Sequence, residues 1–254
     1  MLRLPLDQQL LLVVQTAAQL GLCIHILRNR LQHTYVYFFA YLLVALLQTV
    51  LLVFTPYDRS AYVYIWLSTE GLIVLLYALI VLELYGIVLG NLAGLASVSR
   101  RYLRITLAAA ILISFTLLAF EKSPASLTGY FLILERALVG SLVIFVLFLM
   151  LFLVYYPVPL NRNVIVYSVG YAVYFLTKAA ALFVRNVGHR WDRPLSDLLI
   201  AVSTSCLLFW MFALNSSGET KSMVIGHKWH PEDEEWLLSQ LNEINANLSR
   251  AARK

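Results

Sequence analysis

Hydrophobic residues run through the chain in seven long stretches that short polar breaks separate. A helix needs about 20 mostly apolar residues to cross the hydrocarbon core of a membrane. The pattern therefore predicts an all-α fold, a polytopic membrane bundle of seven transmembrane helices within residues 1–218. The helices are expected at residues 9–27, 35–55, 61–89, 102–120, 129–155, 164–184 and 195–215.

The composition agrees with a membrane protein. The chain is 61% hydrophobic and 13% charged, whereas a soluble domain carries about 25% charged residues. The net charge of +5 is spread over loops and tail without a long basic run, so membrane lipid is the expected partner and nucleic acid is not. Basic residues favour the cytoplasmic side. Those of the tail predict an outside N-terminus and a cytoplasmic C-terminus, in a bacterial inner membrane.

The tail, residues 219–254, carries one further predicted element, an amphipathic helix at about 231–249. Pro231 and the acidic residues after it are typical of a helix start. Apolar residues then recur at heptad spacing, at Leu237, Leu241, Ile244 and Leu248. Two interpretations stay open. The helix packs under the bundle or along the lipid surface, or it docks a partner protein as a coiled-coil helix.

The sequence contains signs of an internal repeat. Residues 37–54 align without gaps on residues 167–184, and helix one aligns more weakly on helix five. The layout would be three helices, a linker helix and three more, with both halves in the same direction. Polar residues fall at equivalent places in such an alignment: Gln15 on Glu135, Gln48 on Lys178 and Glu70 on Ser205.

Four charged residues lie at a similar depth inside predicted transmembrane helices: Glu70, Glu135, Arg136 and Lys178. Ionisable groups are costly in hydrocarbon and normally face a bundle interior or a wet cavity. We expect Glu70 to pair with Lys178, and Glu135 to pair with Arg136 or Lys178. Counted at about 1.5 Å of rise per residue, the polar residues of several helices share one layer. The predicted ligand-binding set is Gln15, Gln48, Glu70, Glu135, Lys178 and Ser205.

A structural clasp between helices is the alternative interpretation of this layer. Glu83 is separate from it, and we expect a salt bridge with Arg28, Arg30 or Arg100. His25 is expected to be a hydrogen-bonded core residue. The sequence contains no HExxH, GxSxG, CxxC or Gly-rich nucleotide loop, so no enzyme, metal or cofactor is predicted.

At the level of architecture, this layout resembles the seven-helix proteins with a three-one-three plan. These include sugar exporters of the SWEET type, microbial rhodopsins and seven-helix sensor modules of bacterial kinases. The chain lacks the Pro-Gln pair of the sugar exporters, and its seventh helix lacks the lysine that holds retinal. A pigment is therefore not expected.

Three functions follow from these patterns. The first is a non-catalytic sensor or signal-coupling module for a small polar ligand, with the tail as its output. The second is a small-solute transporter with a site between two pseudo-equivalent halves. The third is a structural or accessory subunit of a larger membrane complex. The oligomeric state is not predicted.

Overall fold

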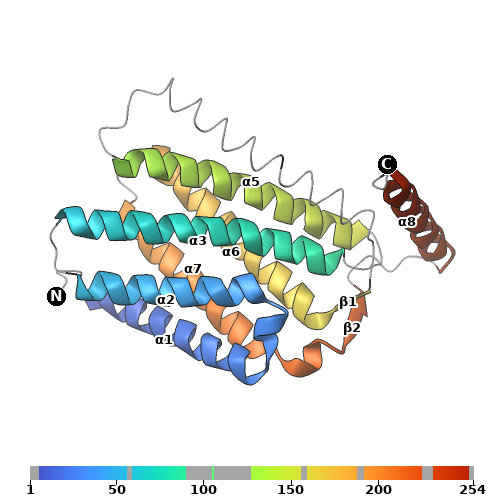
Figure 1. The fold of residues 1–254 in the computed structure, drawn as a ribbon, viewed down its shortest axis with the longest axis horizontal. Helices are drawn as coiled ribbons and strands as arrows, with labels where there is room; N and C mark the ends of the chain where they lie inside the picture. Colours follow the sequence, from blue (N-terminus) through green and yellow to red (C-terminus); the bar gives the residue numbers. More distant parts are fainter. Residues whose placement is uncertain are drawn as a thin grey trace.

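The computed structural model describes residues 6–55, 59–89, 105, 127–155, 159–187, 192–224 and 231–251. Over these residues the chain forms a bundle of long helices (Figure 1). Six of them are long and apolar enough to cross a membrane. They are α1 (Leu6–Arg28), α2 (Val36–Phe54), α3 (Arg59–Val88), α5 (Leu127–Tyr155), α6 (Arg162–Val187) and α7 (Asp192–Ala213).

These six helices confirm six of the seven predicted apolar segments, and their ends lie within three residues of the predicted limits. The seventh segment, residues 102–120, lies outside the described residues except for Ile105 and stays a prediction. The tail helix is also confirmed, because α8 (Pro231–Ala251) begins at the expected proline.

Short elements join the helices at the end of the bundle where α1, α3, α5 and α7 finish (Figure 1). They are the 3-10 turns η1 (Leu31–His33) and η3 (Ser216–Gly218) and the strands β1 (Pro159–Asn161) and β2 (Ser222–Val224). The strands pair antiparallel, with Leu160 opposite Met223. Since β2 belongs to the predicted tail, the first part of that tail is joined to the bundle.

The helices pack in a closed ring, in the order α1, α2, α3, α5, α6, α7 and back to α1. α1 and α7 run in the same direction, because Gln15 contacts Ser203 and, further along both helices, His25 contacts Leu214. We call the end of the bundle at which α1 starts its N-terminal end, and the other its C-terminal end.

The outside of the bundle is apolar. Large hydrophobic side chains such as Leu47, Phe148 and Phe212 are exposed on α2, α5 and α7, and Phe212 retains 78% of its surface. Contiguous apolar surface of this kind marks contact with a membrane or another protein. Together with the length of the six helices, it is consistent with an integral membrane protein.

Aromatic rings in contact with one another fill the interior toward the C-terminal end. We call this group the aromatic plug: Tyr35, Phe38, Tyr167, Tyr171 and Trp210. Its rings lie 4.7 Å to 5.7 Å apart between centroids, mostly in edge-on or tilted pairs. Such pairs add to the stabilisation that burial provides. All five side chains are almost completely buried, so the plug closes this half of the bundle.

Candidate functional site

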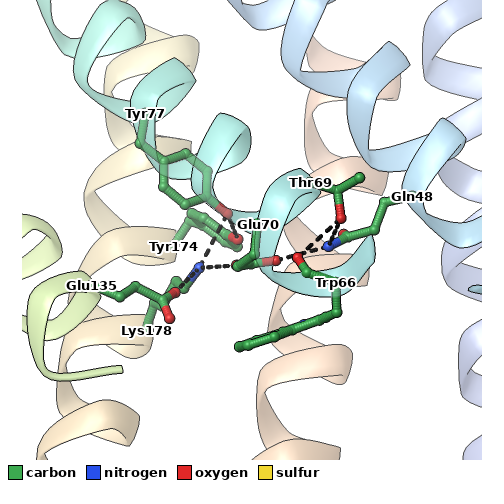
Figure 2. Close-up of polar contacts among 8 residues, drawn as sticks. All are labelled: Gln48, Trp66, Thr69, Glu70, Tyr77, Glu135, Tyr174 and Lys178. Atoms are coloured by element: carbon green, nitrogen blue, oxygen red, sulfur yellow. Dashed lines mark hydrogen bonds and ion pairs between the residues drawn. The ribbon is translucent and has the colours of Figure 1, made fainter. Parts of the chain in front are cut away.

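The charged residues of three helices meet at Lys178. Its ammonium nitrogen Nζ lies 2.7 Å from Oε1 of Glu135 on α5 and 3.3 Å from Oε1 of Glu70 on α3 (Figure 2). The side chains are 11%, 4% and 14% exposed for Lys178, Glu135 and Glu70. The expected pairing of Glu70 with Lys178 is confirmed. Lys178, and not the neighbouring Arg136, is the partner of Glu135.

A tyrosine pair completes the surroundings of the ammonium group. Lys178 Nζ donates to the hydroxyl of Tyr77 at 3.3 Å and lies 4.6 Å from the centre of its ring. The hydroxyl of Tyr77 in turn lies 2.6 Å from that of Tyr174. A cation this close to an aromatic ring gains a cation–π attraction. The ammonium group is thus held by Glu70 and Tyr77 of α3 and by Glu135 of α5.

On the side away from Lys178, Glu70 is held by α2. The amide of Gln48 donates to Oε2 of Glu70 at 3.1 Å and to the hydroxyl of Thr69 at 3.0 Å (Figure 2). The Thr69 hydroxyl donates to the carbonyl oxygens of Ile65 and Trp66 in the preceding turn. A continuous polar chain therefore runs from α2 through α3 and α6 to α5.

A cavity of about 320 Å³ lies beside this cluster, between α1, α2, α3, α6 and α7. Its size is that of a pocket for a small molecule. It lies toward the N-terminal end, because its wall includes the first half of α1 and the second half of α2. The polar side chains in the wall are Gln15, Thr16, Gln19, Gln48, Thr49, Glu70, Lys178 and Ser203, and four tyrosines join them: Tyr41, Tyr62, Tyr77 and Tyr174.

Four residues of the predicted ligand-binding set line this cavity: Gln15, Gln48, Glu70 and Lys178. Glu135 belongs to the cluster but lies on the α5 side of Lys178, and the described cavity wall does not include it. The cavity and the cluster therefore share Glu70 and Lys178.

Ser205 points elsewhere. Its side chain is exposed and its hydroxyl donates to the carbonyl oxygen of Ala201 in its own helix. Ser203 is the α7 hydroxyl in the cavity wall, where it accepts a hydrogen bond from Gln15 at 3.2 Å. Two residues along a helix turn a side chain by about 200°. An alignment that is wrong by two positions therefore selects the opposite face.

Sequence reasoning also missed Tyr77, Gln19 and Thr49. Tyr77 stands in the middle of the apolar run of α3, and no polar neighbour distinguishes it. Gln19 could have been found, because it follows Gln15 by four residues and so lies on the same helix face. In the structure Gln19 donates to the carbonyl oxygen of Leu42 on α2.

Glu83 does not form the expected salt bridge with Arg28 or Arg30, and Arg100 lies outside the described residues. Its carboxylate accepts a hydrogen bond from the backbone N–H of Tyr37 at 3.1 Å and one from the Tyr167 hydroxyl at 3.2 Å. Tyr37 stands in the first turn of α2, whose unpaired N–H groups favour a negative charge. Glu83 therefore holds the start of α2.

A second hydrogen-bonded carboxylate, which is half-buried, lies at the C-terminal end of the bundle. Glu219 accepts hydrogen bonds from the Tyr35 hydroxyl at 2.9 Å and from the Asn163 amide at 2.7 Å. Asn163 is fully buried and also donates to the carbonyl oxygen of Asn215. These bonds tie the connection after α7 to the starts of α2 and α6, below the aromatic plug.

The remaining residues predicted from the sequence are His25 and the apolar residues of the tail helix. The ring of His25 donates from Nε2 to the carbonyl oxygen of Leu214 at 2.7 Å, which confirms the expected hydrogen bond, but His25 is half-buried and not part of the core. In the tail helix Leu237 and Leu241 are buried, Ile244 is 42% exposed, and the side chain of Leu248 lies outside the described residues. No cluster of three His, Cys, Asp or Glu suited to a metal ion occurs in the described ranges.

The polar cluster and its cavity thus join buried charge to open space. No protein-family model, curated protein or solved structure matches the chain.

Proposed function

We propose that this chain is a non-catalytic membrane protein that binds a small polar ligand in the cavity beside Lys178 and passes the binding on to its tail, as a sensor or signal-coupling module. One observation carries the proposal. The cavity of about 320 Å³ is walled by polar and ionisable side chains from five helices, in a bundle whose outside is apolar. A closed ion pair with packed aliphatic walls would have supported a purely structural clasp.

The route from ligand to tail follows from the contacts below the cavity. Tyr41 and Tyr77 in the cavity wall stack at 5.4 Å, and Tyr77 contacts Phe175, which leads to the aromatic plug. Tyr35 of the plug bonds to Glu219, where the predicted tail begins. A ligand that binds two arrangements of these rings differently would shift the population between them.

A solute screen tests the proposal with a matched pair of variants on α7. We expect one or more small polar solutes to raise the unfolding temperature of the purified full chain in detergent. Ser203→Leu fills the cavity wall and should abolish that shift. Ser205→Leu adds the same side chain on the exposed face and should preserve it. A screen without any stabilising solute, or a shift that survives Ser203→Leu, would contradict the proposal.

A small-solute transporter is the second candidate, and the position of the cavity favours it. The wall combines residues of α1, α2 and α3 with residues of α6 and α7, and the plug closes the C-terminal side of the bundle. A site between two halves that opens to one side at a time is what alternating access requires. Uptake of the identified solute into proteoliposomes, lost in Glu70→Gln, would favour transport over sensing.

The three-one-three layout belongs to the same proposal. α3 and α5 run in the same direction, since Trp66 contacts Phe131 and, further along both helices, Tyr85 contacts Phe145. The predicted helix at 102–120, as a seventh crossing, would account for this shared direction. The proposed duplication relates α1 to α5 and α3 to α7. It would therefore relate the parallel pair of α1 and α7 to the parallel pair of α5 and α3.

The orientation, with an outside N-terminus and a cytoplasmic C-terminus in a bacterial inner membrane, rests on the basic residues of the tail. Reporter fusions at each terminus test it. Of the apolar stripe of α8, Ile244 remains exposed and is the proposed contact to a partner protein or to lipid, whereas Leu237 and Leu241 are buried within the chain.

A further inference from the structure

The chemical class of the ligand can be argued from the hydrogen-bond capacity of Lys178. A lysine ammonium group has three N–H donors and no acceptor. In the structure Nζ makes three contacts, to Glu135, Glu70 and Tyr77. All three donors are therefore committed to the protein. An anion, or the carboxylate of a zwitterion, would have to displace one of these partners before it could bind Lys178.

Glu70, in contrast, has acceptor capacity left. A carboxylate offers about four lone-pair positions. Oε1 of Glu70 accepts from Lys178 and Oε2 accepts from Gln48. About two positions therefore remain on a side chain that lines the cavity.

The charge balance of the cluster also favours a cationic ligand. Among the described residues that contact one another here, Glu70 and Glu135 bring two negative charges and Lys178 brings one positive charge. Glu135 is the closer partner and lies behind Lys178, away from the cavity wall. The excess negative charge is thus at Glu70. An uncompensated charge away from water is costly, and a cation in the cavity would compensate it.

The rest of the wall suits an organic cation. The four tyrosines Tyr41, Tyr62, Tyr77 and Tyr174 line the cavity together with Glu70. Aromatic rings attract cations through their faces, and Tyr77 already holds the Lys178 ammonium group in this way. The α1 and α7 side carries the neutral hydrogen-bonding groups of Gln15 and Ser203.

We propose that the cavity binds a small organic cation, with a primary ammonium group donating to Glu70 and a neutral hydrogen-bonding group directed toward Gln15 and Ser203. The inference rests on the proposed ligand-binding function and narrows its ligand to amines with a neutral polar end. It replaces the broader expectation of a small polar ligand of any charge.

Two series of small molecules, each of nearly constant size, test which ligand charge the cavity prefers. The shorter series is 2-aminoethanol, ethylene glycol, glycolate and glycine; the longer is 4-aminobutan-1-ol, 1,4-butanediol, 4-hydroxybutyrate and 4-aminobutyrate. Binding to the full chain in detergent is measured by calorimetry and by the shift in unfolding temperature, with sodium chloride as a further probe. In at least one series we expect the amino alcohol, which is the cationic member, to bind more than about tenfold more tightly than the other three.

Glu70→Gln removes the excess carboxylate and leaves the Lys178–Glu135 pair intact, so the variant should fold and lose the preference for the cation. Glu243→Gln, on the exposed surface of α8, is the control and should keep it. The probe series on the unchanged chain carries the test even if Glu70→Gln fails to fold.

The outcomes separate the two proposals. Tighter binding of a neutral, anionic or zwitterionic member would overturn the cation and leave the ligand site standing. A response to sodium equal to that of the amines would overturn the organic ligand class. A preference for the cationic amino alcohol that persists in Glu70→Gln would overturn the role of Glu70. No response to any probe would overturn both proposals.

Discussion

Replacing Lys178 by Met removes the ammonium group on which Glu70 and Glu135 converge and keeps a side chain of similar length. With an effective dielectric constant of about 20, Coulomb's law gives gross attractions of roughly 6 and 5 kcal/mol at the observed 2.7 Å and 3.3 Å. Desolvation of the three groups offsets much of this attraction. The expected loss of unfolding free energy is about 3–5 kcal/mol, the usual cost of leaving a buried charge without its partner.

The same reasoning predicts a rescue. Lys178→Met combined with Glu70→Gln and Glu135→Gln leaves no charge in the cluster, so most of the lost stability should return. Leu176→Met is the matched control, because Leu176 is on the same helix and 52% exposed; it should change the stability by less than about 0.5 kcal/mol.

Reversible unfolding in mixed micelles measures all of these variants. If Lys178→Met unfolds with the same free energy as the unchanged chain, the two carboxylates are not held by Lys178. If the triple variant is no more stable than Lys178→Met alone, uncompensated charge is not the reason for the loss. Either result would refute the electrostatic account of the cluster.

Two further changes probe the packing around the site. Gly170→Ala would bring a Cβ within 2.3 Å of Nε1 of Trp210, so overpacking should cost about 1–3 kcal/mol of unfolding free energy, whereas Gly140→Ala meets nothing within 4 Å and should not destabilise. Equal stabilities of these two variants would contradict the close packing of the aromatic plug. Glu83→Ala leaves the Tyr37 N–H and the hydroxyl of the buried Tyr167 without their acceptor and should cost about 1–3 kcal/mol. Hydrogen exchange at Tyr37 should accelerate in that variant, and an unchanged rate would show that Glu83 does not hold the start of α2.

The sequence predicted the helices well because the membrane sets their length. An apolar run of about 20 residues between polar breaks leaves little choice of element, so α2 ends within one residue of its predicted limits at each end. The convergence of Glu70, Glu135 and Lys178 was predicted for a related reason. An isolated charge is too costly in hydrocarbon, so buried charges of opposite sign are expected to meet.

The rotation of each helix was much harder to predict. In a soluble bundle an apolar stripe identifies the face that points inward. Here Leu207 faces the cavity and Phe212 faces outward, and both are apolar. The pattern therefore does not distinguish the inner face from the outer one, which is why Ser205 was chosen instead of Ser203. Contacts between distant segments, such as Glu219 with Asn163, leave no local signal at all.

The polar interior is larger than helix association requires. Hydrogen bonds between membrane helices contribute only about 0.6 kcal/mol on average, and one ion pair would suffice to hold α3 to α6. Thr16 and Thr49 instead line open space, and their hydroxyls donate to carbonyl oxygens of their own helices. A chain under selection for stability alone would gain by filling that space with apolar side chains. An excess carboxylate at the edge of a cavity, opposite neutral polar groups, has a physical reason when a cation occupies the space between them.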